Sequence, residues 1–341
     1  MNELNEMWED NWKTGVIESS RRRYLLKELF PKISTNTDLL KYFILAHIYN
    51  LSTSELLYSE KNLLTAFQQG EFKEKELYLV CYFKEFFSDK FLELLDASIN
   101  SELSNKWKFA ELSKNFSSFS KNHWGELKKC LSHFQGVKAI LLVRRDRKFK
   151  GRLVLLNDSG ELVCENKKIW SVEALAKGRV NKKFFLPNGD TPTGFYSIDS
   201  VMPEADQQKL FGKHRRLKID FVERKEIEEN FSEILLEHSW WRSGVIASEL
   251  SRSLLRIHGT GLKNRKIYSK YYPFVTTSGC ISMREDRSIE GQRILLDKLM
   301  ESLKLSPSID NEVEIHGHLC VIELDDKSSK VTLKDIVELD Q

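Results

Sequence analysis

The sequence has few of the residues that interrupt helices and few that could form a disulfide framework. Its 341 residues include only six prolines, 16 glycines and five cysteines. No two cysteines form a Cys-x-x-Cys pair, and the odd number leaves at least one free thiol. These features argue against a small scaffold held together by disulfides.

An excess of charge of one sign is also missing, as are long apolar runs. The 53 basic residues are nearly balanced by 50 acidic ones, and no nucleic-acid-binding motif is present, so we expect no nucleic-acid partner. The most apolar run, from Leu39 to Leu51, contains Lys41 and His47 and is shorter than the roughly 20 residues that span a bilayer. We therefore expect no transmembrane segment, and no secretory signal is visible in the acidic, polar N-terminus.

Helical patterns dominate residues 1–135. Apolar residues recur there at spacings of three and four, with almost no proline or glycine between them. A group of phenylalanines is expected to form the core of this part: Phe83, Phe86, Phe87 and Phe91. A peptide-binding groove is the alternative. We expect residues 1–135 to be a helical domain that docks a protein partner or positions a substrate.

Residues 136–341 change to short β-rich runs separated by turns. A hairpin is expected at Asp158–Gly160, a strand after the turn at Thr191–Gly194, and another strand that ends at His258. Two helical segments interrupt these strands. The sequence thus predicts an α+β chain with a helical N-terminal domain, a boundary near residue 135, and a mainly β second domain.

Cys280 is the residue of this second domain with the clearest chemical potential. Gly279 allows a sharp turn beside it, so that neighbouring amides can converge on one point as an oxyanion site requires. His258, at the end of a predicted strand and followed by Gly259, is the histidine best placed to take the thiol proton. The alternative is that Cys280 is an inert core residue.

Three motifs occur in order: GDTPTGFYSI at residues 189–198, IHG at 257–259 and TSGCISM at 277–283. Together they resemble the L,D-transpeptidase (YkuD-type) family of cell-wall enzymes, over roughly residues 137–322. The resemblance implies a β-sandwich catalytic domain in which Cys280 is the nucleophile, His258 its base, and the Gly259 carbonyl orients the imidazole. It also implies a group of oxyanion and substrate-binding residues: Thr277, Ser278, Gly279 and Arg284.

Two departures from the family pattern affect that assignment. Ser278 stands where the family has a second histidine, and Ser282 stands where it usually has asparagine or arginine. Arg284 is the candidate to replace the missing cation.

The resemblance implies a peptidoglycan L,D-transpeptidase that needs no cofactor and acts in the periplasm or cell envelope. Its partners would be stem peptides, one of which acylates Cys280 and is then transferred to an amine. Two alternatives stay open: an L,D-carboxypeptidase or hydrolase of the same fold, and a non-catalytic module that binds wall peptides.

A zinc site is the competing hypothesis for the last strand. His316, His318 and Cys320 alternate there and would share one face, but no fourth ligand is evident, so we expect no bound metal.

Overall fold

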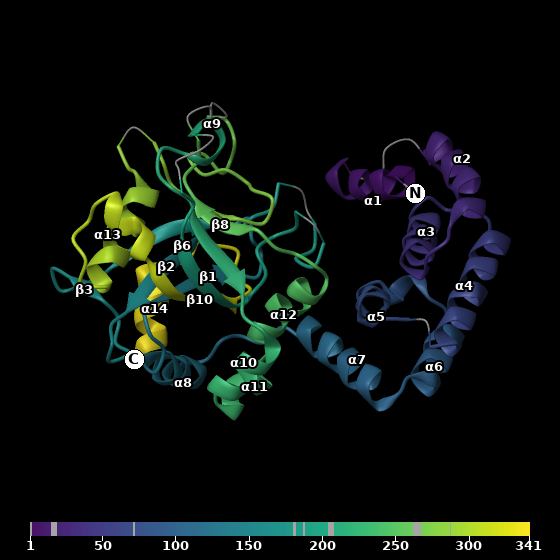
Figure 1. Cartoon of the computed structure of the whole chain (residues 1–341), viewed down its shortest axis with the longest axis horizontal. Helices are drawn as coiled ribbons and strands as arrows, with labels where there is room; N and C mark the ends of the chain where they lie inside the picture. Colours follow the sequence, from purple (N-terminus) through teal and green to yellow (C-terminus); the bar gives the residue numbers. More distant parts are fainter. Residues whose placement is uncertain are drawn as a thin grey trace. The chain divides into compact units, whose positions relative to one another are not determined.

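The computed structural model describes residues 2–14, 19–70, 72–179, 182–186, 188–203, 208–261, 267–286 and 288–341. The chain divides into two compact units, residues 1–115 and 116–341. Figure 1 shows the first unit as helices only, whereas the second contains the strands. The chain therefore combines an N-terminal helical region with a mixed α/β region, as the sequence predicts at this coarse level.

The first unit is built from helices that bury aromatic side chains. Phe87 stacks between Phe43 and Phe91, with ring centroids 4.7 and 4.8 Å apart. Phe83 and Phe91 are each 2% exposed, which confirms them as core residues. The elements of this unit are α1 (Asn2–Thr14), α2 (Ser19–Leu29), η1 (Phe30–Lys32), α3 (Asn36–Ile48), α4 (Thr53–Gln68), α5 (Glu74–Tyr82), η2 (Lys84–Phe86), α6 (Asp89–Ser98) and α7 (Ser101–Lys114).

The second unit begins before the boundary expected near residue 135, because α8 (Lys121–Ser132) belongs to it. The buried Trp124 of α8 donates its indole N–H to Asp340 at 2.8 Å, and Lys128 pairs with the same carboxylate. Asp340 is the last residue of α14 (Leu333–Asp340). Periodicity identifies such an amphipathic helix but does not identify the surface against which it packs.

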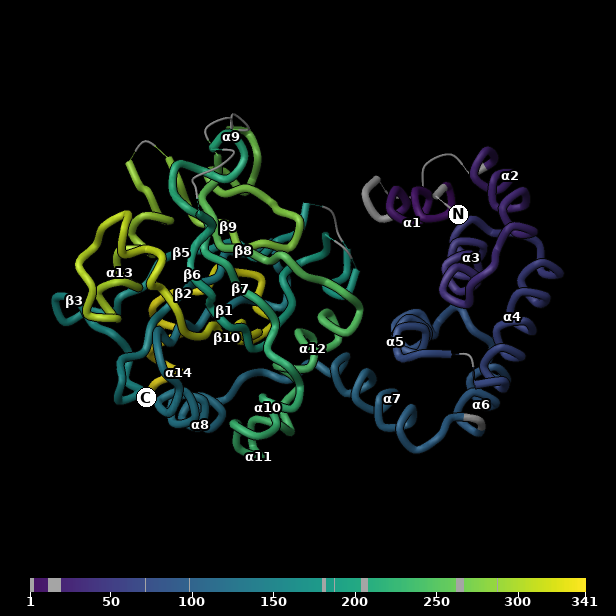
Figure 2. Tube along the Cα trace, viewed as in Figure 1, coloured from purple at the N-terminus to yellow at the C-terminus, as the bar shows by residue number. Residues whose placement is uncertain are grey.

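A closed barrel of eight strands forms the centre of the second unit. In order around the barrel the strands are β1 (Val137–Arg144), β10 (His316–Asp325), β6 (Gly194–Val201), β7 (Leu217–Phe221), β8 (Leu255–His258), β9 (Ile281–Met283), β5 (Ser171–Leu175) and β2 (Gly151–Leu156). The β1–β10 and β8–β9 pairs are parallel and the other pairs are antiparallel. Figure 2 shows β1 and β10 running side by side although they are distant in sequence.

Alternating apolar side chains fill the barrel, as a strand period of two requires. Leu255 and Ile257 of β8 face this core together with Ile281 and Met283 of β9. Arg256 and His258, the alternate residues of β8, therefore point to the opposite side. The core is completed by α13 (Gly291–Ser302), which contributes buried residues such as Leu299.

The remaining elements lie between or beside these strands. A small separate sheet is formed by β3 (Cys164–Glu165) and β4 (Lys168–Ile169). The other helices are α9 (Gln208–Phe211), α10 (Arg224–Asn230), α11 (Glu233–Glu237), η3 (Ser239–Trp241), α12 (Arg242–Glu249) and η4 (Asp310–Glu314). In the described part of the chain no helix is long and apolar enough to cross a membrane.

Candidate active site

Cys280 and His258 are brought together by the parallel pairing of β8 and β9. Ile257 pairs with Ile281, and His258 pairs with Ser282. Cys280 lies two residues before Ser282, the strand partner of His258. Cys280 and His258 are therefore offset by about 7 Å along the strand direction. Both side chains line one cavity of about 730 Å³.

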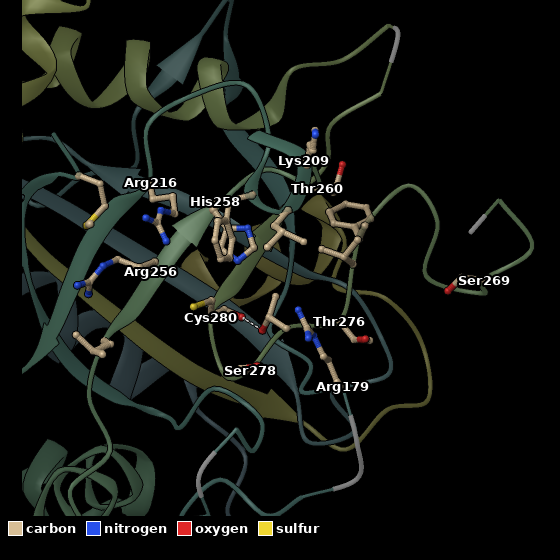
Figure 3. A pocket seen from close by; sticks show the side chains of 17 residues that line it. Arg179, Lys209, Arg216, Arg256, His258, Thr260, Ser269, Thr276, Ser278 and Cys280 are labelled. Atoms are coloured by element: carbon tan, nitrogen blue, oxygen red, sulfur yellow. Dashed lines mark hydrogen bonds between the residues drawn. The ribbon is translucent and has the colours of Figure 1, made fainter. Parts of the chain in front are cut away.

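The cavity is drawn in Figure 3. Its walls come from segments on either side of β8, among them the loop before β9, α9 and the residues after β5. Among the described residues, four cations line it: Arg179, Lys209, Arg216 and Arg256. Ser278 and Thr277 line it as well, so the structure places most of the sequence-predicted site residues in a single cavity.

His258 is held as a neutral imidazole. Its ring is 2% exposed, and Nδ1 lies 2.6 Å from the carbonyl oxygen of Gly259. Since a carbonyl only accepts, Nδ1 carries the proton and Nε2 keeps its lone pair. Burial lowers the pKa of His258 to about 4, which the Gly259 carbonyl opposes and the charges of Arg216 and Arg179 reinforce. The hydrogen bond expected between Gly259 and the imidazole is present, and the ring is in the form that can accept a proton.

Cys280 is partly exposed, and its sulfur lies on the Arg256 side of the cavity (Figure 3). Burial raises the pKa of the thiol, while the main-chain N–H of Arg256 and the charges of Arg256, Arg216 and Arg252 lower it. Among the described residues no hydrogen bond joins the sulfur to His258. The resting state is therefore a neutral thiol and a neutral imidazole that line the same cavity without a hydrogen bond between them.

The backbone at Cys280 is fixed by the turn that precedes it. Thr277 donates its hydroxyl to the carbonyl of Cys280 at 2.6 Å and accepts the N–H of Gly279 at 3.2 Å. Gly279 has φ +105°, a conformation that favours glycine. A side chain at Gly279 would also collide with the guanidinium of Arg252. The sequence-based expectation of a sharp turn at this glycine is confirmed.

The Thr-Pro-Thr-Gly segment, residues 191–194, stabilises the same turn. The buried hydroxyl of Thr191 donates to the carbonyl of Gly279 at 2.9 Å. Arg252, 7% exposed, donates to the carbonyls of Phe184, Asp190 and Gly189. The Thr191 bond ties the segment before β6 to the Cys280 turn, and the Arg252 bonds hold the same segment in place, so the motif has a structural role here.

Glu285 is a site residue that the sequence analysis missed. Its carboxylate accepts the N–H of Thr260 at 3.2 Å and of Lys213 at 3.0 Å. It lies against Gly259, where a Cβ would collide with it. Glu285 thereby holds the main chain whose carbonyl orients His258, and its contact explains the glycine after the histidine.

Neither Ser282, the position that lacks the cation, nor Arg284, the sequence-based candidate to replace it, lines the cavity. Ser282 is fully buried, and its hydroxyl accepts the N–H of Val275 at 3.2 Å. Arg284 pairs with Asp286 at 2.8 Å and is not among the residues that line the cavity. The cavity cations come instead from arginines and a lysine in other segments, which no local motif marks.

The suspected zinc residues of β10 lie in three different environments. His316 is exposed, whereas His318 stacks on Phe195 with an interplanar angle of 9° and Cys320 is fully buried. In the described ranges no group of three or more histidine, cysteine or acidic side chains is arranged to hold a metal ion. All five cysteines are free thiols.

Comparison with known proteins adds no relative to this geometry. No protein-family model, no curated protein and no solved structure matches the chain.

Proposed function

We propose that residues 116–341 form a cysteine-dependent acyltransferase of the L,D-transpeptidase type that acts on peptidoglycan stem peptides. The observation that carries the proposal is the shared cavity of Cys280 and His258, with His258 neutral and oriented by the Gly259 carbonyl. The three motifs of the resemblance also meet here, since Thr191 contacts the Cys280 turn directly. We assign the barrel unit to the L,D-transpeptidase fold on the same grounds.

The first half-reaction forms a thioester. A rotation of the Cys280 side chain brings its sulfur from the Arg256 side towards Nε2 of His258, which accepts the thiol proton. The sulfur attacks the carbonyl carbon of the bond before the terminal D-alanine. The C–N bond then breaks, and the imidazolium returns its proton to the leaving amine.

Charge that develops on the attacked carbonyl oxygen needs donors beside the sulfur. The amides of Gly279 and Cys280 are the nearest in the chain. The Gly279 amide spends its hydrogen in a 3.2 Å bond to Thr277, at the long end of the normal range, and an oxyanion would replace that acceptor. Ser278, exposed and lining the cavity, lies beside these amides.

The second half-reaction decides the product. Transfer to an amine of another stem peptide gives a cross-link and restores the thiol, whereas transfer to water trims the peptide. Activity on wall peptides would take place in the periplasm or cell envelope. The helical unit, residues 1–115, is proposed to dock a protein partner or to position the substrate.

Acylation of Cys280 tests the proposal. The purified chain is incubated with a carbapenem, whose strained lactam acylates reactive thiols, and with a stem tetrapeptide, and intact mass is measured. We expect one adduct that is lost in Cys280→Ala and kept in Cys164→Ala, which removes an exposed thiol outside the cavity. A chain that stays unmodified, or an adduct that survives in Cys280→Ala, would refute the proposed enzymatic activity.

The products separate the alternatives. Peptide dimers indicate transfer, and tripeptides indicate a carboxypeptidase or hydrolase of the same fold. Binding of the tetrapeptide without either product would indicate a non-catalytic wall-peptide module.

A further inference from the structure

Positive charge is concentrated in the cavity. The guanidinium or ammonium groups of Arg179, Lys209, Arg216 and Arg256 line it, and no aspartate or glutamate is among the described residues that do so. These cations come from the segment after β5, from α9, from the residues before β7 and from β8. A cavity lined by one sign of charge concentrates ligands of the opposite sign.

Arg216 lines the cavity together with both reacting groups, and its charge acts on each of them, the thiol of Cys280 and the imidazole of His258. Arg256 is among the main charges that act on the thiol, and Arg179 is among those that act on the imidazole. In Figure 3, Arg216 and Arg256 lie on one side of Cys280 and Arg179 lies on the other.

The guanidinium of Arg216 also contacts an aromatic ring. Its Cζ lies 4.4 Å from the centroid of the Phe211 ring, a cation–π contact. The N–H donors of a guanidinium lie along its edge, which is the part that binds a carboxylate through two parallel hydrogen bonds.

The leaving residue of the proposed reaction carries a carboxylate in a defined place. Its nitrogen must accept a proton from His258. The carbonyl carbon from which that nitrogen departs must be bonded to the sulfur of Cys280. The terminal carboxylate is only three bonds from this carbon. It must therefore lie close to both Cys280 and His258, in the cavity that Arg216 also lines.

We propose, on the basis of the proposed function, that Arg216 binds the terminal carboxylate of the acyl donor. The substrates are then peptides whose leaving residue carries a free carboxylate on the carbon bonded to its nitrogen. Arg216, which directly precedes β7, replaces the cation that the motif lacks at Ser282.

A pair of donors tests this: a stem tetrapeptide that ends in D-alanine and its C-terminal carboxamide. Binding to the full-length Cys280→Ser variant is measured by calorimetry, so that no turnover is needed. A hydrogen-bonded charge pair contributes enough for the carboxamide to bind about tenfold to a hundredfold more weakly. Arg216→Gln should weaken binding of the carboxylate donor by a similar factor and abolish the discrimination.

Two further variants complete the design. Arg216→Lys keeps the charge without the two-pronged geometry and should restore part of the binding. Arg145→Gln is the matched control, because Arg145 is an exposed arginine stacked on Phe116 at 4.8 Å outside the cavity. It should leave binding unchanged.

Equal binding of both donors would overturn the inference, as would discrimination that persists in Arg216→Gln. If Arg216→Gln does not fold, the comparison of the two donors and of Arg216→Lys still decides. Discrimination by Cys280→Ser, together with an unacylated wild-type chain, would retain the carboxylate site and refute the proposed function. Equal acylation of the wild-type chain by both donors would support the proposed function and refute the carboxylate site.

Discussion

Replacement of Thr191 by valine isolates the contact between the Thr-Pro-Thr-Gly segment and the Cys280 turn. Valine keeps the shape of threonine and removes the hydroxyl that donates to the Gly279 carbonyl at 2.9 Å. Thr191 is fully buried and Gly279 is buried, so water cannot replace the lost donor. A buried acceptor left without its partner costs about 1–3 kcal/mol.

That cost should appear in two measurements. In urea unfolding of the full chain, Thr191→Val should lower the free energy of unfolding by about 1–3 kcal/mol, or roughly 3 °C in melting temperature per kcal/mol. Carbapenem acylation of Cys280 should also slow, because the carbonyl next to the nucleophile loses its anchor. Thr191→Ser keeps a hydroxyl and is the control, expected to retain most of both properties. A valine variant with wild-type stability and acylation rate would refute this account of the segment.

Three other outcomes follow from the site. Gly259→Ala should destabilise the protein by about 2–4 kcal/mol and slow acylation of Cys280, since the new Cβ displaces the buried Glu285 carboxylate and its hydrogen bonds; unchanged melting and kinetics would contradict this. The pKa of His258 is about 4 in the folded protein against about 6.5 in the unfolded chain, so its contribution to stability is complete above pH 6.5 and is lost as pH falls towards 4. Unfolding measured across that range should show a shallower decline for His258→Gln, and an identical decline would count against the buried neutral ring. Arg284→Gln should change donor affinity less than twofold by calorimetry, because Arg284 pairs with Asp286 outside the cavity; a larger loss would return Arg284 to the binding site.

Elements with a strong local signal could be predicted from the sequence. The expected strand ends at His258 as β8 does, and the aromatic core of the helical unit is present. The closed barrel could not be derived, because its closure depends on the pairing of β1 with β10 from distant parts of the chain. Periodicity within a strand gives its faces but not its neighbours.

The same distinction applies to the site. Cys280 and His258 are marked by adjacent glycines, and the structure places both in one cavity. Arg216 and Glu285 have no such mark, since their roles follow from the surface onto which the barrel folds them. For Arg284 the sequence did contain a warning: Asp286, two residues later, is close enough to neutralise it.

The parallel pairing of β8 and β9 has an evolutionary consequence. Two parallel neighbours cannot be joined by a tight turn, so the chain between His258 and Cys280 must leave the sheet and return. The strand pairing, together with the turn before Cys280, sets the offset between the two reacting residues. Insertions in the excursion can therefore reshape the rim of the cavity, and so the choice of acceptor, while the spacing of thiol and imidazole is inherited unchanged.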